Sequence, residues 1–229
     1  MKKLLWLAVF ISLIMASPAF AENMFEKMKS SAEAGDAVAQ YKLAMEYYNG
    51  DYFPKDLKKC AEWCEKSAAQ GYAGALMQLG VLYTYGEGVP KDLKKAFELE
   101  EKAAVQGYDV AQFGLGGKYI RGEGVARDPK KAVEWLEKAA AQGNLGALNG
   151  LALAYYEGKT AGIPKDAVRA YAYFELSIKN GDKKEQTAAS MNGLLKTMSK
   201  TQADEARKMS KDILDKIENN SKNHIKATP

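Results

Sequence analysis

Two cysteines, Cys60 and Cys64, are the residues whose type and spacing point most directly to chemistry. They stand four residues apart, and this spacing places both side chains on one side of a helix. An even pair of cysteines in an oxidising compartment indicates a disulfide, and the Cα separation of roughly 6 Å across one helical turn lies within the range that a disulfide spans. The alternative is two free thiols, with Cys60 acting as a small packing residue. A redox-active pair is less favoured, because the spacing is not Cys-x-x-Cys.

Catalytic and metal-binding patterns are otherwise sparse. His224, near the C-terminal end, is the only histidine, so Ser-His and Cys-His nucleophile systems have no base within the expected core. Zinc sites need three or four convergent ligands, and one histidine with two cysteines falls short of that. The Gly-x-Gly pairs follow predicted helices rather than strands and lack a third glycine, which argues against a phosphate loop. The sequence therefore predicts no catalytic residue, no metal site and no cofactor.

The charge pattern argues against nucleic acid as a partner. The formal net charge is +4 over 229 residues, and removal of Lys2 and Lys3 with the N-terminal segment lowers it to +2. A nucleic-acid-binding protein needs a concentrated basic footprint. Runs of mixed charge such as 98–102 are expected to be solvated helix faces. Val and Ile are sparse beside Ala, Leu, Lys and Glu, and this balance favours helices.

The first 21 residues have the features of a secretory signal peptide. Lys2 and Lys3 form a positive n-region, an apolar run covers 4–15, and the segment 17–21 ends in small residues. We expect cleavage after Ala21 and a periplasmic or secreted mature protein with no stable membrane span. The alternative is an uncleaved membrane anchor. It is less favoured, because the apolar run of about a dozen residues is shorter than the roughly 20 that span a bilayer.

A repeat of 36 residues organises the rest of the chain, and self-similarity at this period is typical of solenoids. Its first marker is a glycine at the same position in four successive units: Gly35, Gly71, Gly107 and Gly143. A second set of glycines keeps the same step: Gly50, Gly86, Gly122 and Gly158. An aspartate follows each glycine of the second set: Asp56, Asp92, Asp128 and Asp166. Asp166 comes 38 residues after Asp128, so the fourth unit carries a two-residue insertion within 159–162.

Each unit has the pattern of two antiparallel helices. In the second unit, the first helix carries one apolar stripe at i, i+4, i+7 and i+8: Ala75, Leu79, Leu82 and Tyr83. Gly86 can take a positive φ and end this helix, and Asp92 is a good N-cap for the second helix. One such unit cannot bury its apolar face alone, so several must stack.

The units share the pattern L-G-x-x-Y-x-x-G-x-G-V-x-x-D-x-x-K-A-x-x-W/L-x-x-K-A-A-x-x-G, which resembles the Sel1-like repeat, a relative of the tetratricopeptide repeat. The third unit matches it closely and the second nearly as well, whereas Tyr52 replaces the second glycine in the first unit. The resemblance implies an all-α fold, a right-handed α-solenoid of antiparallel helix pairs. The expected organisation is a signal peptide (1–21), an N-terminal helix (22–34), four repeats (35–70, 71–106, 107–142 and 143–181), C-terminal capping helices (182–218) and a flexible tail (219–229).

By similarity to tetratricopeptide units, the resemblance places a partner-binding groove on the first helix of each unit. The residues expected to line it are rich in aromatic and aliphatic side chains: Tyr41, Met45, Tyr48, Met77, Val81, Thr84, Tyr85, Phe113, Ile120, Arg121, Asn149 and Tyr156. Exposed apolar patches of this kind mark partner sites, and Tyr and Arg are frequent anchors. The alternative is that several of these residues pack between repeats.

Bacterial Sel1-like proteins often act as adaptors, so the resemblance implies a non-enzymatic scaffold that binds a protein or peptide partner, in envelope signalling or host contact. Some secreted, cysteine-rich relatives bind penicillin or weakly hydrolyse β-lactams, and this is one alternative. No Ser-x-x-Lys occurs in the sequence, so the nucleophile of that chemistry is not supplied. A structural component of an envelope assembly is the other alternative.

Overall fold

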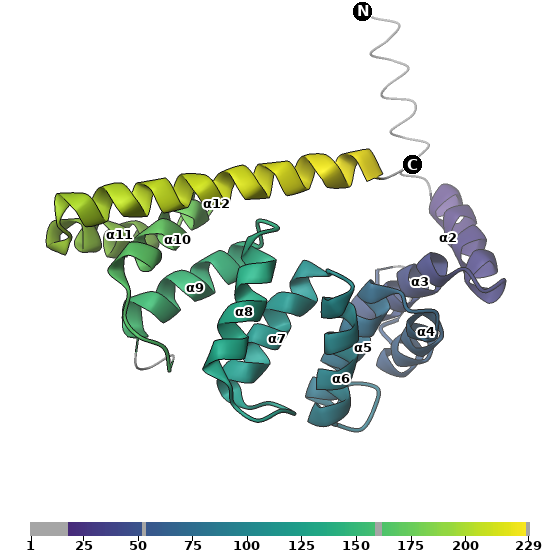
Figure 1. The fold of residues 1–229 in the computed structure, drawn as a ribbon. Helices are drawn as coiled ribbons and strands as arrows, with labels where there is room; N and C mark the ends of the chain where they lie inside the picture. Colours follow the sequence, from purple (N-terminus) through teal and green to yellow (C-terminus); the bar gives the residue numbers. More distant parts are fainter. Residues whose placement is uncertain (1–17, 52–53, 159–161, 228–229) are drawn as a thin grey trace, which may run out of the picture. The chain divides into compact units, whose positions relative to one another are not determined.

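The computed structural model describes residues 18–51, 54–158 and 162–227 (Figure 1). The segment 1–17, which holds most of the expected signal peptide, lies outside the described residues, and so does 159–161 within the expected insertion. All regular secondary structure of the described residues is helical and comprises eleven helices. Among them, no helix is both long enough and apolar enough to span a bilayer. The prediction of an all-α fold built from paired helices is confirmed.

The helices belong to two compact units. Unit 1, residues 1–91, contains α2 Pro18–Glu33, α3 Ala37–Asn49, α4 Leu57–Ala69 and α5 Ala73–Tyr85. Unit 2, residues 92–229, contains α6 Leu93–Val105, α7 Asp109–Arg121, α8 Pro129–Ala140, α9 Leu145–Glu157, α10 Ala167–Lys179, α11 Glu185–Thr197 and α12 Lys200–Ala227. The first helix of each repeat (α3, α5, α7, α9) is called helix A, and the second (α4, α6, α8, α10) is called helix B.

In unit 1 each helix packs on its neighbour in the chain, α2 on α3, α3 on α4 and α4 on α5. Small side chains let the helices approach closely, and Ala44 of α3 and Cys60 of α4 are both fully buried. At the end of α4, the Nε2 atom of Gln70 donates hydrogen bonds to the carbonyl of Gly35 (2.9 Å) and to Oε1 of Gln40 (2.8 Å). Polar and apolar contacts therefore both join the two helices of the first repeat.

The N-terminal helix α2 begins at Pro18, upstream of the expected cleavage point after Ala21. Its Phe25 and Ala32 are buried in one cluster with Leu43 of α3. This helix therefore covers the apolar side of the first repeat.

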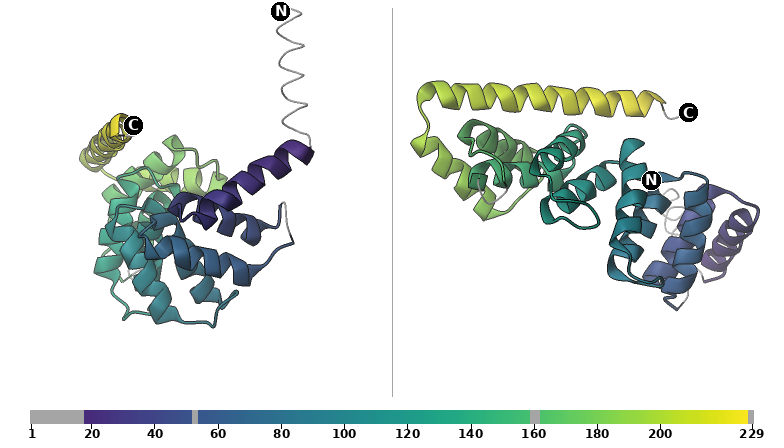
Figure 2. Two further views of the ribbon diagram at one scale, coloured as in Figure 1. Left: turned by 90° about the vertical axis from the view of Figure 1, so that its right-hand side faces the viewer. Right: turned by 60° about the horizontal axis from the view of Figure 1, so that its bottom comes forward.

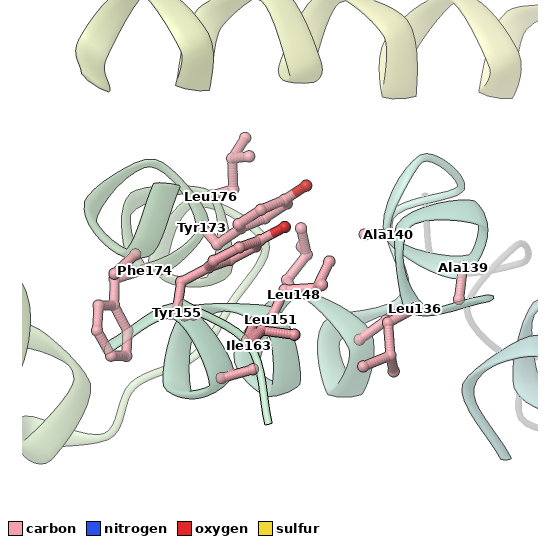
Figure 3. Close-up of a cluster of buried hydrophobic side chains, with 14 residues drawn as sticks. Leu136, Ala139, Ala140, Leu148, Leu151, Tyr155, Ile163, Tyr173, Phe174 and Leu176 are labelled. Carbon is pink, nitrogen blue, oxygen red and sulfur yellow. The ribbon is translucent and has the colours of Figure 1, made fainter. Parts of the chain in front are cut away.

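The core of unit 2 lies between α8, α9 and α10 (Figure 3). Leu148 and Leu151 of α9 and Phe174 of α10 are almost completely excluded from water. Tyr155 and Tyr173 stack with their ring centroids 6.1 Å apart and their planes within 3° of parallel (Figure 3). This cluster buries apolar side chains of repeat 4, and such burial drives folding.

The turn from α7 to α8 shows why two glycines recur in the second and third repeats, at Gly86 and Gly88 and at Gly122 and Gly124. Gly122 has a φ of 72°, and its N–H donates to the carbonyl of Lys118 (2.8 Å), which ends α7. Gly124 also has a φ of 72°, and a Cβ there would overlap the carbonyl oxygen of Leu93 at the start of α6. An aspartate side chain then caps every helix B, as the sequence predicts: Asp56, Asp92, Asp128 and Asp166.

The C-terminal helix α12 packs on α10 (Figure 2). Ile213 and Leu214 contact the core of unit 2, and Ile217 is buried. The helix thus adds a third layer of apolar side chains to repeat 4.

The expected flexible tail, 219–229, is helical through Ala227. No proline or glycine interrupts the chain between the start of α12 and Pro229, so nothing in the sequence ends the helix at 218. The Nδ2 atom of Asn220 also donates to the carbonyl of Ala141, 3.0 Å away, and this contact holds the helix against the end of α8.

Candidate functional site

Every residue of the expected groove lies on a helix A, and none of them is fully buried. The structure places Tyr41, Met45 and Tyr48 on α3, Met77, Val81, Thr84 and Tyr85 on α5, Phe113, Ile120 and Arg121 on α7, and Asn149 and Tyr156 on α9. Because α3 and α5 belong to unit 1 and α7 and α9 to unit 2, these residues form two sets. They are called the unit-1 face and the unit-2 face.

On the unit-1 face, Tyr41 packs between two successive A helices. Its ring lies against the ring of Tyr72, with centroids 5.2 Å apart and planes tilted by 48°. A Cβ at Gly74 would stand 3.0 Å from the Tyr72 ring and 3.2 Å from the Tyr41 ring, so the glycine leaves room for both. Tyr41 therefore contributes to packing between repeats as well as to the exposed surface.

Three other side chains of the unit-1 face differ in their contacts and in their exposure to solvent. The Oγ1 of Thr84 donates to the carbonyl of Gly80, 2.9 Å away, so this hydroxyl is used within its own helix. Tyr85 is 70% exposed, the most open aromatic side chain on this face. Tyr48 on α3 lies beneath the ammonium group of Lys55, 4.9 Å from its ring centroid.

Two polar groups of unit 1 that the sequence did not single out are buried without a hydrogen-bond partner. They are Nε2 of Gln78, next to Met77 on α5, and Oε2 of Glu46 on α3. Burial, and then the nearby charge of Asp51, raise the pKa of Glu46 above its usual value. Unpartnered buried polar groups are uncommon in proteins.

On the unit-2 face, Phe113 of α7 packs on the following helix A. It is 39% exposed, and its ring lies over Gly146 at the start of α9, where a Cβ would stand 2.9 Å from Cζ. Leu153 on α9 is 47% exposed, and the half-exposed Tyr156 meets Phe174 edge to face, with centroids 6.0 Å apart. Ile120 instead packs partly into the core of unit 2.

Arg121 has a defined position at the end of α7. Its Nε and Nη2 donate to the two carboxylate oxygens of Glu123, at 2.7 and 3.0 Å. Its guanidinium group occupies the space that a side chain at Gly117 would fill, since a Cβ there would stand 3.0 Å from Nη1. A planar, bidentate pair of this kind fixes the orientation of the arginine more firmly than a single contact does.

Asn149 has a structural role that its sequence position did not indicate. Its Oδ1 accepts a hydrogen bond from the Ser177 hydroxyl (2.7 Å), whose oxygen also lies 3.4 Å from Oδ2 of Asp182. Asp182 accepts from the backbone N–H of Lys184 (3.0 Å) and from the Thr187 hydroxyl (2.8 Å), and these two bonds hold the pKa of Asp182 below its usual value. Asn149 therefore joins α9 and α10 to the start of α11.

Exposed apolar side chains gather on the A helices. Among the described residues, eight large apolar side chains are exposed: Val38, Tyr85, Val105, Val110, Phe113, Leu145, Leu153 and Tyr156. Seven of them lie on α3, α5, α7 or α9, and only Val105 lies on a helix B. The A helices thus expose more large apolar side chains than the B helices do.

Cys60 and Cys64 are free thiols in the structure, and neither is exposed to water. The disulfide between them stays a prediction, beside the alternative of two free thiols with Cys60 as a small packing residue. The hydrogen bond with Cys60 and burial both raise the pKa of Cys64. The described residues contain no cluster of three or more His, Cys, Asp or Glu side chains that could hold a metal ion.

A buried ion pair lies inside unit 2. The Nζ of Lys118 on α7 stands 3.2 Å from Oε1 of Glu100 on α6, and both side chains are at most 4% exposed. Burial raises the pKa of Glu100, against the opposing effect of the Lys118 charge. The expectation that the run 98–102 forms a solvated face is wrong at Glu100.

These features define a class: an α-helical repeat protein with apolar side chains exposed on one helix of each pair. A family model of the Sel1 repeat matches residues 37–72, 73–108, 109–144 and 146–182, more than half of the sequence. The chain belongs to the Sel1 repeat family. No curated protein matches the sequence significantly.

Solved structures show the same fold. A Sel1 repeat protein from Oxalobacter formigenes is 26% identical, with a TM-score of 0.64 over 78% of this chain and 66% of that one. A protective antigen present in uropathogenic Escherichia coli strains, which displays an SLR fold, is 27% identical, with a TM-score of 0.52 over 88% of this chain and 50% of that one. A candidate Sel1 repeat protein from Klebsiella pneumoniae subsp. pneumoniae is 25% identical, with a TM-score of 0.53 over 81% of this chain and 99% of that one. The fold class is thus the α-solenoid that the sequence predicts.

Proposed function

We propose that this protein is a binding scaffold that holds a protein or peptide partner on its A helices and acts without catalysis. Sel1 repeats generally mediate protein–protein interactions, and this chain is built from four of them. The proposal assigns the contact to the unit-1 and unit-2 faces.

The observation that carries the proposal is the unequal distribution of exposed apolar side chains. Seven of the eight large ones among the described residues lie on A helices. Exposed apolar surface is costly to leave in water, and its burial is worth about 25 cal/mol per Å². A partner that covers Tyr85 on one face, or Phe113 and Leu153 on the other, would recover this free energy.

Polar groups beside these side chains would orient the partner. Binding sites generally combine apolar walls with a few placed polar groups. On the unit-2 face the Arg121–Glu123 pair supplies such groups at the end of α7. On α5 the Nε2 of Gln78, next to Met77, is a buried donor without a protein acceptor.

We further propose that the partner is met outside the cytoplasm, in the periplasm or beyond the cell. The support is the sequence of residues 1–21, with its positive start, apolar run and small residues before Glu22. The similarity to a protective antigen of uropathogenic strains supports host contact as the setting, and envelope signalling is the other setting that we propose. N-terminal sequencing of exported protein tests the cleavage point, and a mature chain that starts at Met1 would contradict it.

Site-specific photocrosslinking in cells tests the binding role. A photoreactive amino acid is placed at Tyr85 on the unit-1 face and at Leu153 on the unit-2 face, and mass spectrometry identifies the protein captured by each. The matched controls carry the same group at Glu62 on α4 and Glu134 on α8, which are exposed positions on B helices. We expect one protein to be captured at a helix-A position and by neither control.

An affinity measurement with the captured protein completes the test. Substitution Leu153→Glu places a charge on the unit-2 face, and we expect it to weaken binding at least about tenfold if this face is in contact. Capture at Glu62 and Glu134 equal to that at Tyr85 and Leu153, or no capture at either helix-A position, would overturn the assignment of the A helices.

A further inference from the structure

The Glu100–Lys118 ion pair stands at the junction where helix A of one repeat packs on helix B of the repeat before it. Both residues are on packed helices, α6 and α7, and both side chains are at most 4% exposed. No other ion pair found among the described residues is buried to this degree, since each of the others has one side chain at least 44% exposed.

The same two positions carry no charge in the neighbouring repeats. Thirty-six residues earlier they are occupied by Cys64 and Leu82, and 36 residues later by Leu136 and Ala154. All four of these side chains are buried, on helices that pack on each other, α4 with α5 and α8 with α9. The fold therefore accepts an apolar pair at this place, and the ion pair distinguishes one junction from the others.

Stability does not explain a buried ion pair at a position that an apolar pair can fill. Removing two charges from water costs more than their attraction commonly returns, and apolar replacements of such pairs are often as stable or more stable. Breaking the pair is different, because the remaining charge stays buried without compensation. Such a pair therefore destabilises an incorrect packing of helices more than it stabilises the correct one.

Repeat proteins have a specific need for such a penalty. Their stacking surfaces resemble one another, so a helix A can dock on the wrong helix B, in its own chain or in a second copy. If α7 docked on another helix B of this protein, Lys118 would face Cys64, Leu136 or Phe174 at the position of Glu100. By the typical cost of an uncompensated buried charge, that arrangement would be disfavoured about a hundredfold or more.

We propose that the Glu100–Lys118 pair sets the stacking order of the repeats, by making α6 the one helix B on which α7 docks without leaving a buried charge unpaired. The pair thereby suppresses domain-swapped and misaligned assemblies. This role concerns assembly of the solenoid and is independent of the proposed partner.

Refolding experiments test the stacking role. The double variant Glu100→Leu/Lys118→Ala copies the Leu136–Ala154 junction. The charge-swapped variant Glu100→Lys/Lys118→Glu keeps an ion pair but exchanges the positive and the negative charge between the two helices. Each protein is unfolded, refolded at several concentrations and analysed by size-exclusion chromatography with light scattering. We expect the apolar variant to fold but to form at least about tenfold more oligomer than the wild type, whereas the charge-swapped variant should stay close to the wild type.

A mixing experiment supplies a second, direct readout. The single variants Glu100→Lys and Lys118→Glu each juxtapose like charges, but exchange of repeats between the two chains restores opposite charges at both junctions. An equimolar mixture, refolded together, should therefore form a heterodimer that neither variant forms alone. An apolar double variant that refolds with the oligomer content of the wild type, together with no heterodimer in the mixture, would overturn the proposal.

Discussion

The ring of Phe113 on α7 lies against the backbone of Gly146 on α9, where a Cβ would stand 2.9 Å from the ring. Tyr41 and Gly74 repeat this relationship in unit 1, where the corresponding distance is 3.2 Å. In both units the aromatic residue belongs to one helix A and the glycine to the next. These aromatic side chains therefore serve two purposes, since they fix the spacing of adjacent A helices and remain partly exposed.

The Phe113–Gly146 contact should appear as an energetic coupling. Alanine is up to about 1 kcal/mol better than glycine in a helix, so Gly146→Ala should stabilise the protein once Phe113 is replaced by alanine. With Phe113 present, displacement of its ring should remove at least about 0.5 kcal/mol of that gain. Denaturant unfolding of the two single variants and the double variant measures the coupling, and strictly additive effects would show that the ring moves away at no cost.

Gly124 should be among the least replaceable glycines. A side chain there needs a left-handed backbone and overlaps the Leu93 carbonyl, so we expect Gly124→Ala to cost at least about 2 kcal/mol. Gly193 in α11 is the matched control, because no atom lies within 4 Å of its Cβ position. Gly193→Ala should leave stability unchanged or raise it by up to about 1 kcal/mol. Thermal unfolding of both variants decides, and equal effects would contradict the assignment.

The apolar replacement of the buried ion pair should not weaken the fold. We expect Glu100→Leu/Lys118→Ala to be as stable as the wild type or up to about 4 kcal/mol more stable. The single change Glu100→Leu leaves the Lys118 charge buried without its carboxylate partner and should cost about 3–5 kcal/mol. Chemical denaturation of the three proteins measures this, and a double variant weaker than the single one would refute the comparison with Leu136 and Ala154.

Asp182 should make a pH-dependent contribution to stability. Its pKa is lowered in the folded protein by hydrogen bonds from Lys184 and Thr187, so its ionised form is favoured there. The stabilisation is therefore present above the pKa of the unfolded carboxyl, about 3.9, and is lost as the pH falls through the lower pKa of the folded state. Asp182→Asn should be less stable than the wild type at pH 7, and the difference should shrink below about pH 4.

Melting temperatures between pH 3 and pH 7 test this expectation. Thr187→Val removes one of the hydrogen bonds to Asp182 and should show a smaller difference of the same sign. A difference between the wild type and Asp182→Asn that stays constant across this range would rule out a lowered pKa as its source.

The two cysteines should respond differently to truncation. Alanine occupies the position of Cys60 in the other repeats, at Ala96, Ala132 and Ala170, so Cys60→Ala should change stability by less than about 1 kcal/mol. Cys64 stands where other repeats place larger residues, including Leu136 and Phe174, and Cys64→Ala should cost more because it leaves a cavity. Thermal unfolding compares the variants. Intact-mass analysis after alkylation should find two modified thiols, and an unmodified pair would demonstrate a disulfide.

Much of the fold could be predicted because its determinants are local. Gly122 ends α7 through its own positive φ, and Asp128 caps α8 through the next few backbone N–H groups. Such effects need only neighbouring residues, so the spacing of glycines and aspartates was sufficient. The end of α12 was missed for the opposite reason, since Asn220 reaches the carbonyl of Ala141, which follows α8 and is remote in sequence.

For the candidate site, the sequence predicted only the helices on which its residues lie. Period and pattern identified the A helices, but they did not show that Asn149 is held by Ser177 and Asp182, which lie beyond its own repeat helix. Glu100 was also missed, because its sequence neighbours are charged and its partner Lys118 is on the next repeat. The position of Glu100 is occupied by Cys64 and Leu136 in the neighbouring repeats, and both are apolar. Comparing these equivalent positions would have indicated that Glu100 is buried.

The position of α12 has a consequence for how the protein is made. Ile213, Leu214 and Ile217 complete the apolar core of repeat 4, although they are more than thirty residues later in the chain than α10, on which their helix packs. Synthesis proceeds from the N-terminus, so the first repeats can fold while this helix is still missing. A nascent chain stalled before residue 213 would expose the leucines and aromatic rings of α9 and α10, and it would be a natural substrate for chaperones and proteases.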